Sequence, residues 1–242
     1  MSALHYQAAS HSHVGMVRKI NEDACLDHTW EGLWAVADGM GGHAAGDYVS
    51  SLVMDSLCNL PLFETLDSFA QAVRENLVRV NRKVREETVR RGVAMMGSTV
   101  VVLVAHGSQA IGLWAGDSRL YRLREGRIER LSHDHSYVQE LQDSGLLNEA
   151  EARVHPRGNI VTRAIGVEDH FELQSVALQV QPGDTYLLCS DGLNKTAEDH
   201  EIADVLGHDD PYQVVRSLVH LGLTRGAPDN ITAVVVKANG RQ

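Results

Sequence analysis

Short apolar runs rich in β-branched residues recur along the chain, separated by clusters of Gly, Pro, Asn, Asp and Ser. Runs of this length, bounded by turn-forming residues, predict β-strands. The predicted strands are 5–12, 33–37, 99–105, 110–115, 120–123, 128–131, 171–180, 185–189 and 231–236. The run 33–37 is apolar throughout, which indicates a strand that is covered on both faces.

Apolar residues at helical spacing predict helices over 49–60 and 66–84, the second with Arg, Lys and Glu on its other face. Two further helices are predicted near 197–206 and 212–223. Strands and helices come in clusters rather than in strict alternation, which favours an α+β fold with mostly antiparallel sheets. We expect two sheets packed face to face and flanked by helices, a four-layer αββα sandwich that forms one domain over residues 1–242.

The segment 132–166 has a different character, because it is rich in His, Asp and Glu and shows only weak helical spacing around 137–147. It is too long for a plain connection between two elements. Long segments of this kind often act as lids or substrate loops, and we expect that role here.

Composition narrows the possible functions. The 242 residues carry a net charge of -10, which argues against non-specific binding to nucleic acid or to anionic lipid.

The odd number of cysteines, three, and the lack of a secretory signal in the first six residues favour a reduced, cytoplasmic protein. Residues 92–116 lack Lys, Arg, Asp and Glu, but the turn formers at 106–109 predict a buried β-hairpin rather than a membrane span. We expect a monomer without membrane or nucleic-acid partners.

Aspartates stand at the ends of four predicted strands. Asp38 follows the run 33–37 and precedes a cluster of glycines, Asp117 and Asp191 follow two later strands, and Asp229 precedes the last one. Glycine at such places lets the backbone approach a ligand closely. The pattern predicts that the four carboxylates converge on one place.

Converging carboxylates suit hard divalent cations, since Mg²⁺ and Mn²⁺ prefer oxygen ligands and need few protein carboxylates each. With Glu22 and Asp23, the set fits two such ions better than zinc. If Asp38 bridges both ions, the carbonyl of Gly39 is close enough to be a further ligand. Two ions would activate a bridging water to hydroxide and hold the oxygens of a phosphoryl group, and Arg18 is the candidate bidentate donor to that phosphate.

Six motifs, at 18–24, 37–42, 96–99, 115–119, 190–192 and 229–232, resemble in order and spacing those of the metal-dependent protein phosphatases, the type 2C Ser/Thr phosphatases, in their stand-alone bacterial form. The resemblance implies an αββα sandwich with a binuclear Mn²⁺ or Mg²⁺ centre between the sheets. It also implies hydrolysis of phosphoserine and phosphothreonine in phosphorylated proteins, with a bacterial Ser/Thr kinase and its substrates as partners.

The resemblance further implies roles for single residues. Asp38 would bridge the two ions, the Gly39 carbonyl would be a ligand, and Asp191 and Asp229 would complete one site.

The second ion would be held by Glu22 and Asp23, directly or through water, and Arg18 would clamp the phosphate. Asp117, together with Asp191, would bind a weaker third metal.

Two positions depart from the family pattern. Many eukaryotic members have His where this chain has Met40, so a side-chain acid is missing there and water on a metal is left to protonate the leaving group. His13 stands where many bacterial members have Asp. The segment 132–166, including 134–136, would contain the flap of the family.

Several alternatives remain open on the sequence alone. The run 39–44 fits a loose dinucleotide-binding pattern, and a phosphatase-like domain could bind phosphoproteins without turnover. Asp117 could be a simple hairpin corner, and Arg18 could pair with Glu22 or Asp23 at the surface.

The pairs His11/His13 and His133/His135 invite a zinc interpretation without a complete zinc motif. Cys189 lacks the Arg of a cysteine phosphatase at the required distance, and it is expected in the core.

Overall fold

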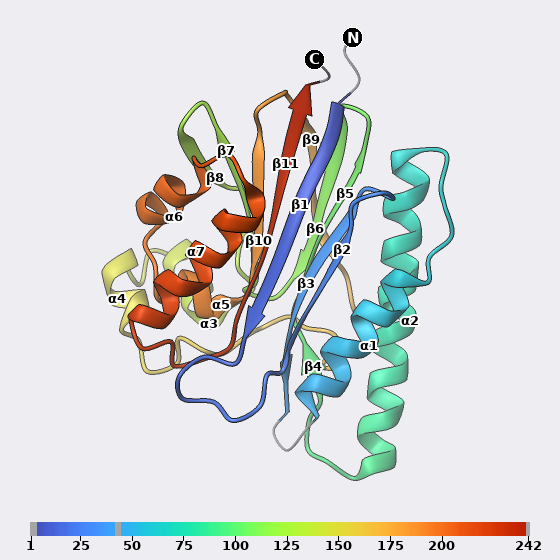
Figure 1. The fold of residues 1–242 in the computed structure, drawn as a ribbon. Helices are drawn as coiled ribbons and strands as arrows, with labels where there is room; N and C mark the ends of the chain where they lie inside the picture. The colour runs from blue at the N-terminus through green and yellow to red at the C-terminus, as the bar shows by residue number, and fades with distance from the viewer. Residues whose placement is uncertain (1–3, 42–44, 241–242) are drawn as a thin grey trace.

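Two antiparallel β-sheets form the centre of the computed structural model, which describes residues 4–41 and 45–240 (Figure 1). The first sheet has the order β1 (Leu4–His13), β11 (Ile231–Gly240), β10 (Thr185–Cys189), β7 (Arg119–Arg124) and β8 (Arg127–Arg130). The second has the order β2 (Asp23–His28), β3 (Leu33–Met40), β5 (Val100–His106), β6 (Gln109–Ala115) and β9 (Gln174–Gln179), with β4 (Gly97–Ser98) paired to β3.

Helices cover the outer face of each sheet. α1 (Gly46–Cys58) and α2 (Leu66–Arg91) pack on the second sheet, and α5 (Asp191–Asn194), α6 (Asp199–Leu206) and α7 (Pro211–Thr224) pack on the first (Figure 1). α3 (Tyr137–Asp143) and α4 (Glu149–Arg153) belong to the segment 132–166. The predicted four-layer αββα sandwich is confirmed.

Strand β3 shows why the layers form. Successive side chains of a strand point to opposite faces. Trp34 and Val36 therefore lie in the core between the sheets, whereas Leu33, Ala35 and Ala37 lie in the core under α1 and α2. Burial of one such large apolar side chain contributes about 1.5–3 kcal/mol, and both faces of β3 contribute.

Several elements differ from the predictions. β2 was not predicted, because its short apolar stretch lies between Asp and His residues and stays half-exposed at the edge of the sheet. β3 continues to Met40 rather than ending at 37, because Gly39 and Met40 pair with β4. β9 begins at Gln174 rather than at 171, and the short helices α4 and α5 were also missed.

The charge-free stretch 92–116 forms the hairpin of β5 and β6, as predicted. Among residues 4–41 and 45–240, no helix has the length and apolarity needed to cross a membrane.

The strand directions decide where the site lies. The start of β1 and the end of β11 pair at one end of the sandwich, whereas the C-terminal ends of β3 and β10 and the start of β11 lie at the other end (Figure 1). β3 and β10 belong to different sheets, so residues at their ends face one another across the gap between the sheets.

Candidate metal centre

The end of the sandwich where β3 and β10 end and β11 begins gathers acidic side chains. Asp38 on β3 pairs in register with Asp23 on β2, while Asp191 opens α5 directly after β10. Asp117 lies in the turn after β6, and Asp229 directly precedes β11. Burial, and then the negative charges of the other four aspartates, hold the pKa of Asp38 well above its usual range. The four strand-end aspartates and Asp23 therefore lie at the same end of the sandwich, close enough for the charges of the other four to act on Asp38.

The backbone of Asp38 is fixed by Ser98 of β4 and by Thr99, which lies between β4 and β5. Its carbonyl oxygen accepts hydrogen bonds from the Thr99 N–H at 2.9 Å and from the Ser98 Oγ at 3.0 Å. Its own N–H donates to the Thr99 Oγ1 at 3.2 Å. These bonds hold the acid in place although its side chain faces other negative charges.

Asp23 is held by a serine that follows β10. The Ser190 Oγ donates to the Asp23 Oδ2 at 2.7 Å and accepts from the Thr232 N–H at 2.9 Å. The second oxygen of Asp23, Oδ1, has no hydrogen-bond partner in the described part of the chain, and neither has the Oδ1 of Asp191. Buried polar oxygens without partners are costly, and they mark a place where a cation would compensate the charge.

The carboxylates do not form a closed cage. Among the described residues no three His, Cys, Asp or Glu side chains converge as a complete ligand cluster. Mg²⁺ and Mn²⁺ commonly keep several waters and take few protein ligands, so an open arrangement with unpartnered carboxylate oxygens fits these ions.

Asn230 organises the loop that carries Arg18 and Glu22, a role that was not predicted. Its Nδ2 donates to the carbonyls of Val14 at 2.8 Å and Ile20 at 3.0 Å, and its Oδ1 accepts from the Glu22 N–H at 2.8 Å. A polar residue between Asp229 and the apolar strand β11 was the only signal of it in the sequence.

Glu22 and Gly39 lie against the start of α1. The Glu22 carbonyl accepts from the Gly39 N–H at 3.0 Å, and its Oε1 accepts from the Gly46 N–H at 3.2 Å. A Cβ on Gly39 would come within 2.1 Å of the Gly46 carbonyl oxygen, so this close approach requires glycine. The rest of the glycine-rich motif, residues 42–44, lies outside the described residues.

Arg18 contacts the acids directly. Its Nη2 donates to the Asp229 Oδ2 at 2.8 Å, and 51% of its side chain is exposed. The guanidinium therefore lies at the rim of the acidic cluster, where it faces both solvent and Asp229. The surface ion pair expected as an alternative exists, but its partner is Asp229 rather than Glu22 or Asp23.

Asp117 is more than a hairpin corner, because it is buried and faces Asp191. Burial, followed by the charge of Asp191, raises the pKa of Asp117 to about 7. Beside it the flap segment is anchored to the sheet, since the His135 N–H donates to the Gly116 carbonyl at 2.9 Å and the Gly116 N–H donates to the His135 Nδ1 at 3.1 Å.

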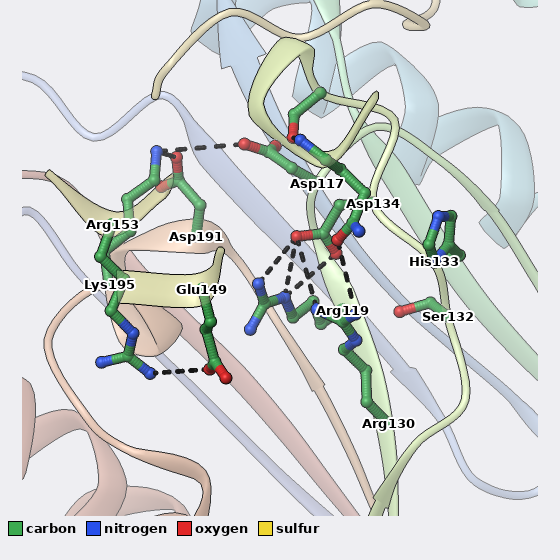
Figure 2. Close-up of polar contacts among 12 residues, drawn as sticks. Asp117, Arg119, Arg130, Ser132, His133, Asp134, Glu149, Arg153, Asp191 and Lys195 are labelled. Carbon is green, nitrogen blue, oxygen red and sulfur yellow. Dashed lines mark hydrogen bonds and ion pairs between the residues drawn. The ribbon is translucent and has the colours of Figure 1, made fainter. Parts of the chain in front are cut away.

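A cavity of roughly 520 Å³ lies beside the acids, between the segment 132–166 and the helices α5 and α6. Asp117 and Lys195 line one side, and Arg130 and His155 are among the residues that line the rest. In its wall, Arg119 binds Asp134 through two guanidinium nitrogens, with Arg130 close by (Figure 2).

Three of the alternatives considered from the sequence lose support, namely a dinucleotide site, a zinc site and a catalytic cysteine. β3 is antiparallel to all of its neighbours, so no βαβ unit for a dinucleotide exists there. His13 accepts from the Gly15 N–H at 3.0 Å and His133 pairs with Asp143, without a zinc cluster in the described residues. Cys189 is fully buried, which raises the pKa of its thiol to about 12, as expected of a core residue.

An αββα sandwich with an acidic centre at one end of its two sheets is the architecture of a metal-dependent phosphatase. The family model for protein phosphatase 2C matches residues 8–221. The chain belongs to this family of metal-dependent serine/threonine protein phosphatases.

Known proteins agree with this assignment. The serine/threonine protein phosphatase PstP of Mycobacterium tuberculosis is 35% identical over 231 residues, which cover 94% of this chain and 44% of PstP, so the chain spans less than half the length of this relative. The structure of PppA, described as a key regulatory component of T6SS in Pseudomonas aeruginosa, is 62% identical with a TM-score of 0.93, covering 98% of this chain and 100% of PppA. The PstP catalytic domain in complex with two manganese ions is 32% identical with a TM-score of 0.86, covering 98% and 99% of the two chains.

The raised pKa values predict an unusual pH dependence of the metal-free chain. Burial is the main cause that raises the pKa of Asp23, as of Asp117, to about 7, from an ordinary value of about 3.9. The folded state then binds more protons than the unfolded state between about pH 4 and pH 7. We expect the free energy of unfolding of the metal-free chain to fall by several kcal/mol over this range.

Urea unfolding of the metal-free chain at closely spaced pH values measures this dependence. The matched variant Asp117→Asn removes one of the titrating groups with a raised pKa and should flatten the curve. Equal slopes for the variant and the unsubstituted chain would contradict the account.

Proposed function

We propose that this chain hydrolyses phosphoserine and phosphothreonine in proteins at a centre of two Mn²⁺ or Mg²⁺ ions. The observation that carries the proposal is the pair of buried, unpartnered carboxylate oxygens on Asp23 and Asp191 beside Asp38. Burying several carboxylates together without compensating charge is unfavourable, and divalent cations supply that charge.

The assignment of ligands follows from position. Asp38 lies among all the other acids and would bridge the two ions. Asp191 and Asp229, with the Gly39 carbonyl, would complete one site. Glu22 and Asp23 would serve the other, directly or through water. When bound, the ions would supply an activated water and would neutralise the charge of the phosphoryl group.

Arg18 would bind the phosphate of the substrate. A guanidinium is planar and permanently charged, which suits two parallel hydrogen bonds to phosphate oxygens. Its half-exposed side chain already reaches the acidic cluster through Asp229, so a phosphate at the ions would lie within reach of the same group. This cation also lowers the repulsion between an acidic protein and an anionic substrate.

Met40 offers no proton to the leaving group. Its thioether is half-buried at the end of β3 and carries no ionisable group. The proposal therefore assigns no side-chain acid at this position, and it leaves protonation of the departing serine or threonine oxygen to water.

The expected partners are phosphorylated proteins and the bacterial Ser/Thr kinase that phosphorylates them. The likeness to PppA supports a narrower proposal, namely that the chain is itself a regulatory component of T6SS and acts by removing phosphate from a protein. A phosphatase of this kind opposes its kinase by restoring the uncharged hydroxyl that phosphorylation had converted to a dianion.

Asp38→Asn tests the metal centre most simply. We expect kcat/KM for a phosphothreonine peptide with Mn²⁺ to fall at least ~100-fold, equivalent to about 2.7 kcal/mol of transition-state stabilisation. The thermal midpoint of the metal-free variant should not fall, because the substitution removes one of the mutually repelling charges.

The control Asp204→Asn changes the same group on the exposed face of α6 and should leave activity unchanged. Activity that survives EDTA, or survives Asp38→Asn, would contradict the proposal. Saturable binding of phosphopeptide without release of phosphate would favour a sensing domain instead.

Arg18→Ala tests the phosphate contact. Charge-assisted hydrogen bonds contribute about 1.5–3 kcal/mol, so we expect kcat/KM for the peptide to fall roughly 10- to 100-fold. Lys19→Ala, which removes the exposed neighbouring cation, should change kcat/KM less than twofold if contact rather than net charge matters. Similar losses in both variants would show that Arg18 acts only through the overall field.

A further inference from the structure

Lys195 places a positive charge inside the acidic centre. It follows α5, and its Nζ forms an ion pair with the Asp191 Oδ2 and lies 3.9 Å from the Asp117 Oδ2 (Figure 2). The two carboxylates belong to different sheets of the sandwich, one after β10 and the other after β6. One ammonium group therefore contacts both members of the pair that would hold a third metal ion.

The position of Lys195 is set by local structure. Its N–H donates to the Asp191 carbonyl at 2.9 Å, which closes the single turn of α5 and brings the lysine onto the same face as Asp191. The Nζ also donates to the Asn159 Oδ1 at 2.8 Å, and Asn159 belongs to the flap segment. Only 33% of the lysine side chain is exposed.

These contacts conflict with a third divalent ion. An ion between Asp117 and Asp191 would face the ammonium at short range and would compete with it for the same carboxylate oxygens. The lysine is covalently attached, so its effective concentration at this place does not depend on the metal concentration in solution.

We propose that the ammonium of Lys195 replaces the third divalent ion, so that the centre holds two ions and not three. This inference rests on the proposed metal centre, because it describes how many ions that centre holds. Lys195 acts as a positioning residue, which neutralises the pair Asp117–Asp191 and connects it to the flap through Asn159.

Counting bound Mn²⁺ tests the proposal without an activity assay. The EPR signal of free Mn²⁺, measured while the ion is titrated into the metal-free chain, gives the number of ions bound per chain. We expect two for the unsubstituted chain and three for Lys195→Met, with the additional ion bound more weakly. Lys195→Arg keeps the charge and should bind two, as should Lys83→Met on the exposed face of α2.

A second variant keeps the test decisive if Lys195→Met does not fold. Asp117→Asn should leave the count at two, because no divalent ion depends on this carboxylate. Three ions in the unsubstituted chain, one of them lost in Asp117→Asn, would overturn the inference, as would a count of two in folded Lys195→Met. A chain that binds no Mn²⁺ would contradict the proposed metal centre and this inference together, whereas the other outcomes leave the phosphatase proposal intact.

Discussion

Mutual repulsion among buried carboxylates is the constraint on which the active end of this molecule depends. Asp23, Asp38, Asp117 and Asp191 approach one another because β2 begins, and β3, β6 and β10 end, at the same end of the two sheets. Burial and the charges of neighbouring aspartates raise the pKa of Asp23, Asp38 and Asp117, so ionising this cluster is unfavourable. The fold holds them together through backbone and hydroxyl hydrogen bonds, and cations then convert an unfavourable cluster into a binding site.

The two sheets supply the rigidity that this arrangement needs. The core between them contains fully buried side chains from both, such as Trp34 and Leu103 facing Tyr186 and Val234. Close packing of this kind resists small displacements, so the repulsion at one end cannot simply push the strands apart. Two cations compensate part of the charge, Arg18 at Asp229 and Lys195 at Asp191 and Asp117.

The sequence predicted those parts of the structure that local pattern determines. Apolar periodicity predicted most strands and the long helices, and the aspartates at strand ends predicted where acidic side chains gather. Each of these patterns can be read from a few consecutive residues. The edge strand β2 was not predicted, because its polar residues make its sequence resemble that of a loop. The contacts of Asn230 with Glu22, 208 positions away, and of Lys195 with Asp117 and Asn159 could not be predicted, because the folded topology brings these segments together.

The central claim is that the clustered carboxylates bind two divalent ions. Anomalous diffraction at the manganese absorption edge, from crystals equilibrated with Mn²⁺, tests it most directly. The account predicts two anomalous peaks that share Asp38 as a ligand, and no peak between Asp117 and Asp191. The absence of any manganese peak in contact with Asp38 would contradict it.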